Sequence, residues 1–198
     1  MAKFTPILLG SDINVYGMAR SFNEAYGIKV QAWAATQLAA TRYSKIVDVE
    51  VHPGFSEDPG FMEVMQEKIK EYQNHEEPVI LIACGDGYAE LLAKHKQELE
   101  GTFVVPYIDY QLLEKLISKE GFYEVCEEYG LPYPKTKIIK LADYQDGSYA
   151  DVPFAFPVAL KPEDPVSWLD VQFEGRKKAF VIKDLAEFKD IVGKIYTN

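Results

Sequence analysis

Two lysines, one at the end of a predicted strand and one on a predicted helix, are candidate side chains for an anionic ligand. Lys161 ends the stretch Phe-Pro-Val-Ala-Leu-Lys-Pro at 156–162, which predicts a strand that is apolar on both faces and therefore fully buried. Such a strand holds its terminal side chain with little freedom, and the lysine ammonium is a compact cation suited to phosphate oxygens. Lys119 lies on a predicted amphipathic helix. Taken singly, each lysine is also explained as an ordinary solvated side chain.

Two glycine-rich turns form a second group of candidate residues. Gly10-Ser11-Asp12 follows a predicted strand at 4–10, and Gly85-Asp86-Gly87 follows another at 78–84. In a doubly wound sheet, ligands bind beyond the carboxyl ends of the strands, where glycines let a ligand approach backbone N–H groups. The two turns are therefore candidate substrate-binding loops, and ordinary strand-to-helix turn chemistry is the alternative.

Signatures and composition exclude several classes of function. GxGxxG and GxxxxGK[ST] are both absent, which disfavours a dinucleotide-binding Rossmann enzyme and a P-loop NTPase. The 198 residues carry 21 basic and 31 acidic side chains, a net charge of −10, which argues against general nucleic-acid binding and against docking on anionic lipid. The basic cluster Arg176-Lys177-Lys178 lies in the second part of the chain and favours that part as the host of an anionic ligand.

The cysteines and histidines show no metal-binding spacing. Cys84 and Cys126 lie far apart in apolar settings, and the three histidines are scattered along the chain. We therefore expect buried, reduced cysteines and no zinc site. No apolar run approaches 18 residues and the N-terminus does not resemble a signal sequence, so we expect a cytoplasmic protein without membrane insertion.

The elements that must position these residues divide the chain in two, and the first part, residues 1–113, alternates between strands and helices. Predicted strands lie at 4–10, 28–33, 45–51, 78–84 and 103–107, and predicted helices at 14–26, 59–72 and 88–99. We expect Asn14 and Asp58 to cap the first two helices and Gly27 to end the first. The alternation predicts an α/β domain with a doubly wound parallel sheet.

From about residue 110 the pattern changes. Residues 110–129 are predicted to be helical in two pieces, broken near Ser118 or Gly121, and the stretch 130–134 then stops the helix. Predicted strands follow at 136–141, 154–161 and 178–182, and a last helix at 184–196. Three strands are few for an independent domain, so the region 114–198 looks like the first part of one.

The lysines and the segments between them together resemble the opening half of the ATP-grasp fold. In that superfamily a lysine precedes a helix, a Gly-[Ile/Leu]-Pro-x-Pro turn follows it, and a second lysine ends a strand. The matching residues here are Lys119, Phe122, the turn Gly130-Leu131-Pro132-Tyr133-Pro134-Lys135-Thr136 and the strand Phe156-Pro157-Val158-Ala159-Leu160-Lys161-Pro162. The resemblance implies a Rossmann-like pre-ATP-grasp domain at 1–113 and the first α+β lobe of an ATP-grasp domain at 114–198.

Further segments are similar to the D-aspartate ligases, the ATP-grasp enzymes that build cross-bridges in bacterial cell walls. These segments are 6–12, 14–20, 82–88, 122–129 and 171–180, and the likeness extends from about residue 5 to 196. The resemblance implies a carboxylate–amine ligase, in which ATP phosphorylates the β-carboxylate of D-aspartate and a lysine amine of the peptidoglycan precursor attacks the acyl phosphate. An ATP-grasp relative with another substrate, such as a carbamoyl-phosphate-synthase-like enzyme, and a non-catalytic binding module are the alternatives.

The resemblance also implies roles for single residues. Lys119 and Lys161 would neutralise ATP phosphates, and Gly175 and Arg176 would belong to the small loop that covers the triphosphate, although many superfamily members have several glycines there. The acidic and asparagine ligands of Mg²⁺ are expected beyond Asn198, and no catalytic residue is assigned within 1–198. We therefore expect the 198-residue chain alone not to catalyse ligation.

Overall fold

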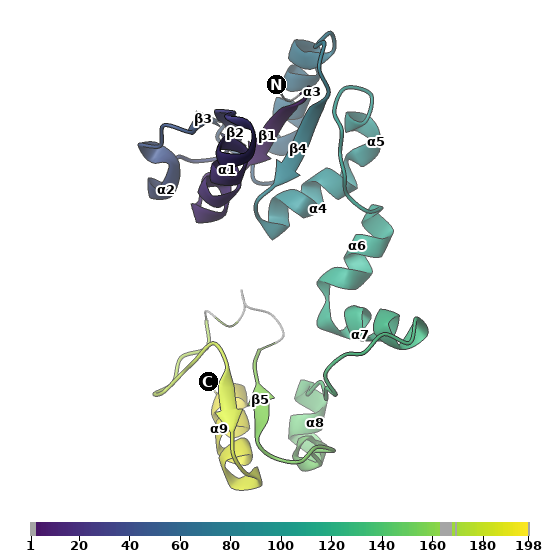
Figure 1. The fold of residues 1–198 in the computed structure, drawn as a ribbon. Coiled ribbons are helices and arrows are strands. Elements are labelled where there is room, and N and C mark those ends of the chain that lie inside the picture. The colour runs from purple at the N-terminus through teal and green to yellow at the C-terminus, as the bar shows by residue number, and fades with distance from the viewer. Residues whose placement is uncertain (1–2, 163–167, 169, 198) are drawn as a thin grey trace. The chain divides into compact units, whose positions relative to one another are not determined.

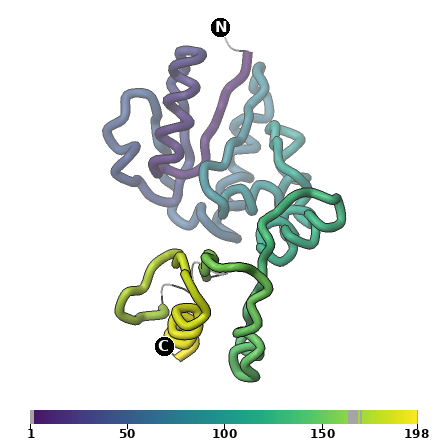
Figure 2. Tube along the Cα trace, turned by 60° about the horizontal axis from the view of Figure 1, so that its bottom comes forward, coloured from purple at the N-terminus to yellow at the C-terminus, as the bar shows by residue number. Residues whose placement is uncertain are grey.

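The computed structural model describes residues 3–162, 168 and 170–197. The chain divides into two compact units, Met1–Lys115 and Leu116–Asn198, called unit 1 and unit 2 below. Figure 1 labels their helices and strands. The trace in Figure 2 passes from unit 1, in purple to teal, through a helical connection to unit 2, in green to yellow.

Unit 1 is built on a four-stranded parallel sheet. Its strands are β1 (Thr5–Leu9), β2 (Val30–Ala34), β3 (Val47–Val51) and β4 (Val79–Ala83), in the order β3-β2-β1-β4. The register places Leu9 of β1 opposite Trp33 of β2 and Ala83 of β4. The predicted parallel α/β sheet is therefore confirmed, and helical crossovers connect its strands because parallel neighbours cannot be joined by tight turns.

Helices cover both faces of this sheet (Figure 1). They are α1 (Ile13–Tyr26), α2 (Ala39–Arg42), α3 (Gly60–Tyr72), α4 (Asp86–Lys94) and α5 (Lys96–Leu99). On one face, α1 packs Val15 and Ala19 against the strands. On the other face, α3, α4 and α5 close a larger core around Trp33, which is completely buried. Successive strand side chains thus enter two separate cores, as expected for a sheet covered on both faces.

The ends of α1 show which side chain acts as a cap. The N-cap is Asp12 rather than the predicted Asn14, and its carboxylate accepts hydrogen bonds from the backbone N–H groups of Asn14 and Val15. Asn14 already lies within the helix, so its side chain cannot cap the first turn. Gly27 ends the helix at φ = 67°, as predicted.

Three other predictions for unit 1 need correction. Helix α3 begins at Gly60, and the Asp58 carboxylate contacts the ring of His95 at 3.0 Å instead of capping α3. The helix predicted after β4 is interrupted at the same His95, between α4 and α5. The strand predicted at 103–107 reduces to one isolated bridge with β4. The contact between Asp58 and His95 joins segments 37 residues apart, and local patterns do not encode such contacts.

Unit 2 contains short helices and a two-stranded antiparallel sheet. Its helices are α6 (Tyr110–Ile117), which spans the boundary between the units, α7 (Lys119–Glu128), α8 (Leu141–Asp146), the 3-10 helix η1 (Ser148–Ala150) and α9 (Leu185–Thr197); its strands are β5 (Val158–Leu160) and β6 (Phe180–Ile182). The predicted break between α6 and α7 is confirmed, because the Ser118 hydroxyl accepts a hydrogen bond from the N–H of Gly121 and caps α7. No helix in the described parts of the chain is long and apolar enough to cross a membrane.

The sheet of unit 2 differs from the prediction in two ways. The strand predicted at 136–141 is wrong: these residues form no ladder with described strands, and α8 begins at their end. The prediction of a strand buried on both faces is also wrong, since Ala159 of β5 is exposed. A sheet of two strands has one covered face, and there Phe188 and Val192 of α9 join the small core of the unit.

Candidate functional site

Unit 2 contains a cavity of about 960 Å³. One wall is β5, a second is the extended segment 134–139, and α9 contributes apolar side chains that include Phe188 and Val192. A cavity of this size, with mostly apolar walls and a few polar groups, is typical of sites for small molecules and cofactors. Both Lys119 and Lys161 line it.

The structure brings these two predicted lysines together. Lys119 is the first residue of α7, directly after the capping Ser118, and its Nζ donates a hydrogen bond to the carbonyl oxygen of Pro162 at 3.3 Å. Because Pro162 follows Lys161, this bond ties the start of α7 to the end of β5. Lys161 is exposed and makes no ion pair with any residue that the structure describes. Two ammonium groups on one largely apolar cavity would attract an anionic ligand.

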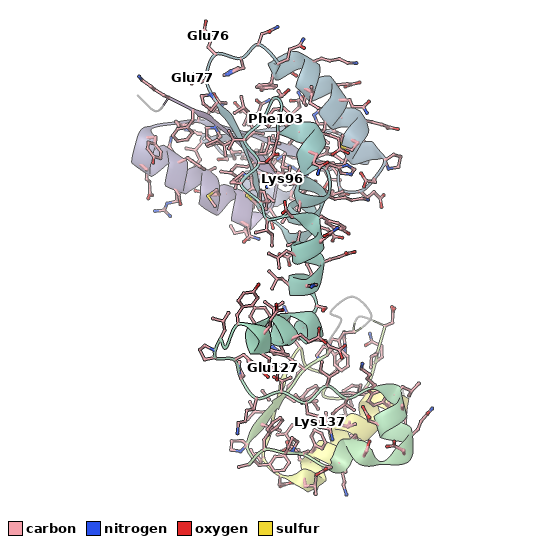
Figure 3. The ribbon with its side chains drawn as sticks, turned by 90° about the vertical axis from the view of Figure 1, so that its right-hand side faces the viewer. Glu76, Glu77, Lys96, Phe103, Glu127 and Lys137 are labelled. Carbon is pink, nitrogen blue, oxygen red and sulfur yellow. The ribbon has the colours of Figure 1, made fainter. Side chains whose placement is uncertain are left out.

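Two further lysines, which the sequence motifs do not single out, also line the cavity. Lys137, labelled in Figure 3, donates hydrogen bonds from Nζ to the carbonyl oxygens of Ser148 at 2.7 Å and Asp151 at 2.6 Å. Lys135 stands two positions earlier on the same extended segment. Side chains two apart on an extended chain point the same way, so the pattern Lys-Thr-Lys after Pro134 was the signal that could have found them.

Gly175 and Arg176 are not among the residues that line the cavity. Gly175 turns the chain at φ = 81°, and the Arg176 guanidinium stacks on the ring of Trp168, 5.2 Å from its centroid. Arg176 also donates a hydrogen bond to the carbonyl oxygen of Trp168. Trp168 itself lines the cavity, so this loop contacts one residue of the cavity wall. Its role in covering a triphosphate stays a prediction.

The residues of the cavity fit a nucleotide but not its metal ion. Among the residues that the structure describes, no carboxylate lines the cavity, and there is no group of three or more His, Cys, Asp and Glu side chains that could hold a metal. Mg²⁺ takes one or two carboxylates in addition to phosphate oxygens. Glu163 and Asp164, which the sequence places close to Lys161, lie outside the described residues. The lysines and apolar walls therefore fit the phosphate and organic parts of a nucleotide without supplying metal ligands.

The two glycine-rich turns of unit 1 lie side by side. They follow β1 and β4, which are neighbours in the sheet, and the N–H of Cys84 donates to the carbonyl oxygen of Leu9 at 3.1 Å. The chain leaves β1 toward β2 but reaches β4 on the opposite side of β1, so the strand order reverses here. Such a reversal opens the crevice in which doubly wound sheets bind ligands. The predicted position of each turn beyond the carboxyl end of a strand is confirmed, the structure adds that the two strands are neighbours, and substrate contact stays a prediction.

The residues of the first turn make hydrogen bonds that stabilise the fold of unit 1. Ser11 is buried, and its hydroxyl donates to the carbonyl oxygen of Thr36 at 2.7 Å and accepts from the N–H of Leu38 at 3.3 Å. Asp12 caps α1, and Gly10 adopts φ = 116°, a conformation that side chains disfavour. All three residues thus have structural roles, which agrees with the alternative of ordinary turn chemistry.

The second turn is more open. Gly85, Asp86 and Gly87 are exposed, and no side chain caps α4, which begins there. The Asp86 carboxylate has no partner among the residues that the structure describes. Burial and, less strongly, the charge of Asp12 raise the pKa of the adjacent Cys84 thiol to about 11, so that the thiol stays protonated and is a poor nucleophile at neutral pH.

We compared the sequence with protein-family models and with curated proteins. No protein-family model matches the chain. A D-aspartate ligase from Enterococcus faecium (strain Aus0004) is 61% identical over 196 residues, which cover 98% of this chain and 47% of that protein. The chain thus spans about half the length of the curated relative that it matches. This identity confirms the resemblance to the D-aspartate ligases.

Two solved structures align with almost the whole of this chain. An L-amino acid ligase from Bacillus licheniformis aligns with a TM-score of 0.58 at 14% identity, covering 98% of this chain and 43% of that one. An N5-carboxyaminoimidazole ribonucleotide synthetase from Thermotoga maritima aligns with a TM-score of 0.49 at 19% identity, covering 96% of this chain and 43% of that one. The first structure supports the predicted α/β fold, and the parallel sheet of unit 1 confirms it. The assignment of residues 114–198 to the first lobe of an ATP-grasp domain stays a prediction.

Proposed function

We propose that the intact gene product is an ATP-dependent carboxylate–amine ligase of the ATP-grasp superfamily. The proposal starts from the resemblance of this chain to the D-aspartate ligases, which extends over about half the length of the relative. Its amino-acid substrate is D-aspartate, and its acceptor is a lysine amine of the peptidoglycan precursor. Because that precursor is made in the cytoplasm, the proposal includes a cytoplasmic location.

The proposed reaction has two steps. A carboxylate oxygen of D-aspartate attacks the γ-phosphorus of ATP, the bond from this phosphorus to the bridging oxygen breaks, and ADP leaves. The acceptor nitrogen then attacks the acyl carbon, inorganic phosphate leaves, and the nitrogen loses a proton to give the amide. Negative charge shifts onto the oxygens of the transferred phosphoryl group and of ADP in the first step, and fixed cations stabilise such charge.

The observation that carries the proposal is the meeting of Lys119 and Lys161 at one cavity, in a chain that is 61% identical to a D-aspartate ligase. In this proposal both ammonium groups contact ATP phosphates, and the apolar walls of the cavity accept the organic part of the nucleotide. Gly175 and Arg176 belong to a loop that covers the triphosphate. Ligands for Mg²⁺ come from outside the described residues.

The two regions of the chain have different tasks in this proposal. Residues 114–198 are the first lobe of the ATP-grasp domain, and residues 1–113 are the pre-ATP-grasp domain that holds the amino acid. Gly10-Ser11-Asp12 and Gly85-Asp86-Gly87 form the edge of the sheet where that substrate binds. The reversal of strand order between β1 and β4 supports this placement.

An assay of the intact gene product tests the activity. ADP release is measured with ATP, Mg²⁺ and an amine acceptor in the presence of D-aspartate, L-aspartate, D-glutamate or bicarbonate. We expect D-aspartate to stimulate ADP release and amide formation above the other three substrates. Equal stimulation by all four, or none by D-aspartate, contradicts the proposed substrate.

Substitution of Lys161 tests the site. We expect Lys161→Met to reduce kcat/KM for ATP about 100-fold, the usual effect of removing one group that stabilises developing charge. Lys189→Met is the matched control, since Lys189 is an exposed lysine of α9 that does not line the cavity. Equal kinetics for the two variants would show that Lys161 does not contact ATP.

A further inference from the structure

Two tyrosine hydroxyls lie at the carboxyl edge of the unit 1 sheet, beside the glycine-rich turns. The Tyr107 hydroxyl accepts a hydrogen bond from the N–H of Ala83, the last residue of β4, at 2.7 Å. The Tyr88 hydroxyl accepts one from the N–H of Ala35, directly after β2, at 3.3 Å. Both rings pack against the same core cluster, so the two tyrosines lie on one face of the sheet.

Both hydroxyls accept a hydrogen bond, but neither donates one to a residue that the structure describes. A phenol can donate one hydrogen bond and accept others, and a half-buried phenol usually does both. Tyr88 and Tyr107 accept from the backbone, and neither hydroxyl hydrogen has an acceptor among the residues that the structure describes. Tyr72 in the same unit is the opposite case, because its hydroxyl donates to Oε1 of Gln31 at 2.9 Å.

The positions of both rings are determined by several contacts. The Tyr88 ring lies 5.6 Å from that of Phe55 and borders Gly10, where an added Cβ would lie 3.6 Å from the Tyr88 ring. Lys96, labelled in Figure 3, donates a hydrogen bond from Nζ to the carbonyl oxygen of Tyr107 at 2.8 Å. The two hydroxyls are therefore held in place before any ligand binds, which reduces the entropy lost on binding.

Burial keeps the hydroxyls of Tyr88 and Tyr107 neutral, so both can donate a hydrogen bond at this edge of the sheet. Burial raises the pKa of Tyr88 and the pKa of Tyr107 above the ordinary value of 10.0, so both hydroxyls keep their hydrogens at neutral pH. The nearest acidic side chain of the first turn, Asp12, already accepts hydrogen bonds from the first turn of α1. An anionic oxygen is the acceptor that gains most from two neutral donors in a partly buried place.

We propose that Tyr88 and Tyr107 donate hydrogen bonds to carboxylate oxygens of the amino-acid substrate, at the edge of the sheet between β2 and β4. The inference rests on the proposed function and adds the groups that recognise its substrate. In this arrangement each hydroxyl has two tasks: it binds the N–H at the end of a strand and it presents its hydrogen to the ligand. An amino acid with two carboxylates suits a pair of donors on either side of β1.

Three tyrosine-to-phenylalanine variants of the intact gene product test this proposal. Tyr88→Phe and Tyr107→Phe each remove one donor, and we expect each to weaken D-aspartate binding about tenfold, the usual effect of losing a hydrogen bond to a charged group. The KM for ATP should not change, because ATP binds in unit 2. Tyr72→Phe is the control, since it also removes one tyrosine hydrogen bond of unit 1, but the Tyr72 hydroxyl already donates its hydrogen to Gln31 within β2. Binding is measured by calorimetric titration with D-aspartate, and ATP kinetics are measured in parallel.

Thermal unfolding of the same variants separates binding from folding. All three substitutions leave a backbone or amide group without its partner and should lower Tm to a similar degree, whereas only Tyr88→Phe and Tyr107→Phe should weaken D-aspartate binding. If either variant binds D-aspartate as tightly as the wild type, or if Tyr72→Phe weakens it equally, the assignment is wrong. A wild-type protein that neither binds nor uses D-aspartate contradicts the proposed function itself.

Discussion

Unit 1 and unit 2 use their apolar residues in different ways. In unit 1 four parallel strands are covered on both faces, and side chains such as Leu9, Trp33 and Phe61 have no exposed surface. In unit 2 two short strands share a small core with α9, and several apolar side chains of these elements line a cavity of about 960 Å³. The interior of unit 1 is thus filled by its own side chains, while unit 2 leaves a cavity among its apolar side chains.

Two lysines show the same contrast. Lys68 in α3 is buried, its Nζ lies 2.8 Å from both carboxylate oxygens of Glu50 and 2.9 Å from Glu71, and it lies over the ring of Trp33. Lys161 is exposed on a cavity and has no ion pair with described residues. A buried ammonium must be paired to be tolerated, whereas an exposed one on a concave surface can bind an external anion. The lysine in the better-formed ion network is therefore the structural one.

Truncation of a core side chain tests the first contrast and should have the largest effect. We expect Phe61→Ala to lower the free energy of unfolding by about 3–5 kcal/mol, because the buried ring leaves a cavity. The 198 residues contain two tryptophans, Trp33 and Trp168, so urea unfolding followed by fluorescence in a Trp168→Phe background reports on unit 1. The control is Phe122→Ala in unit 2, where Phe122 is 43% exposed; its unfolding is followed through Trp168 in a Trp33→Phe background and should cost much less. Equal losses would mean that the two units do not differ in packing.

Replacement of the buried lysine should have an intermediate effect. Lys68→Met removes the partner of Glu50 and Glu71, and we expect a loss of about 2 kcal/mol, below the value for fully buried pairs because both carboxylates are partly exposed. Chemical denaturation measures this loss, and the KM for ATP should stay unchanged. The control is Lys140→Met in unit 2, since Lys140 and Glu120 form an exposed pair worth at most about 0.5 kcal/mol. A similar loss in both variants would remove the distinction between the two ion pairs.

The pH dependence of Asp58 should give the smallest effect. A hydrogen bond from Lys94 first, and one from His95 next, hold the pKa of this carboxyl below its ordinary value of 3.8. A carboxyl whose pKa is lower in the folded than in the unfolded protein stabilises the fold at pH values above its ordinary pKa. This contribution to the free energy of unfolding disappears as the pH falls through the pKa of the folded state. We therefore expect Asp58→Asn to cost about 1 kcal/mol at pH 6, with the difference from wild type vanishing toward pH 2.

Thermal unfolding between pH 2 and pH 7 measures that difference. Asp190→Asn in unit 2 is the control, because Asp190 forms an exposed pair with Lys194 on α9. We expect the control to follow the wild type within about 0.5 kcal/mol at every pH. A difference for Asp58→Asn that grows as the pH falls would contradict the role of Asp58 as a charged hydrogen-bond acceptor.

Elements with strong local signals were predictable from the sequence. The strands β1 and β4, the end of α1 at Gly27 and the break at Ser118 follow from apolar runs, a C-terminal glycine and a capping serine. The strand predicted at 136–141 was wrong because an apolar, extended pattern does not reveal whether a partner strand exists. In the structure, Lys137 of this segment is instead held by backbone carbonyls near η1.

The candidate site was predictable in part. The motifs named Lys119 and Lys161, but they do not reveal that Lys135 and Lys137 line the same cavity or that Arg176 stacks on Trp168. The sequence also does not distinguish Tyr88 and Tyr107 from other tyrosines. What distinguishes them is the backbone N–H group that each hydroxyl binds. These groups belong to residues 53 and 24 positions away along the chain.

The sequence by itself determined the class of the fold, the alternation of strands and helices in the first region, and the lysines that carry the proposed chemistry. These properties depend on residue type and on spacing within one element, which are local. The tertiary structure alone decided the strand order β3-β2-β1-β4, the pairing of Lys68, and the meeting of Lys119 with the end of β5. These depend on contacts between distant segments, and such contacts form only when burial of the whole set of apolar side chains selects one packing.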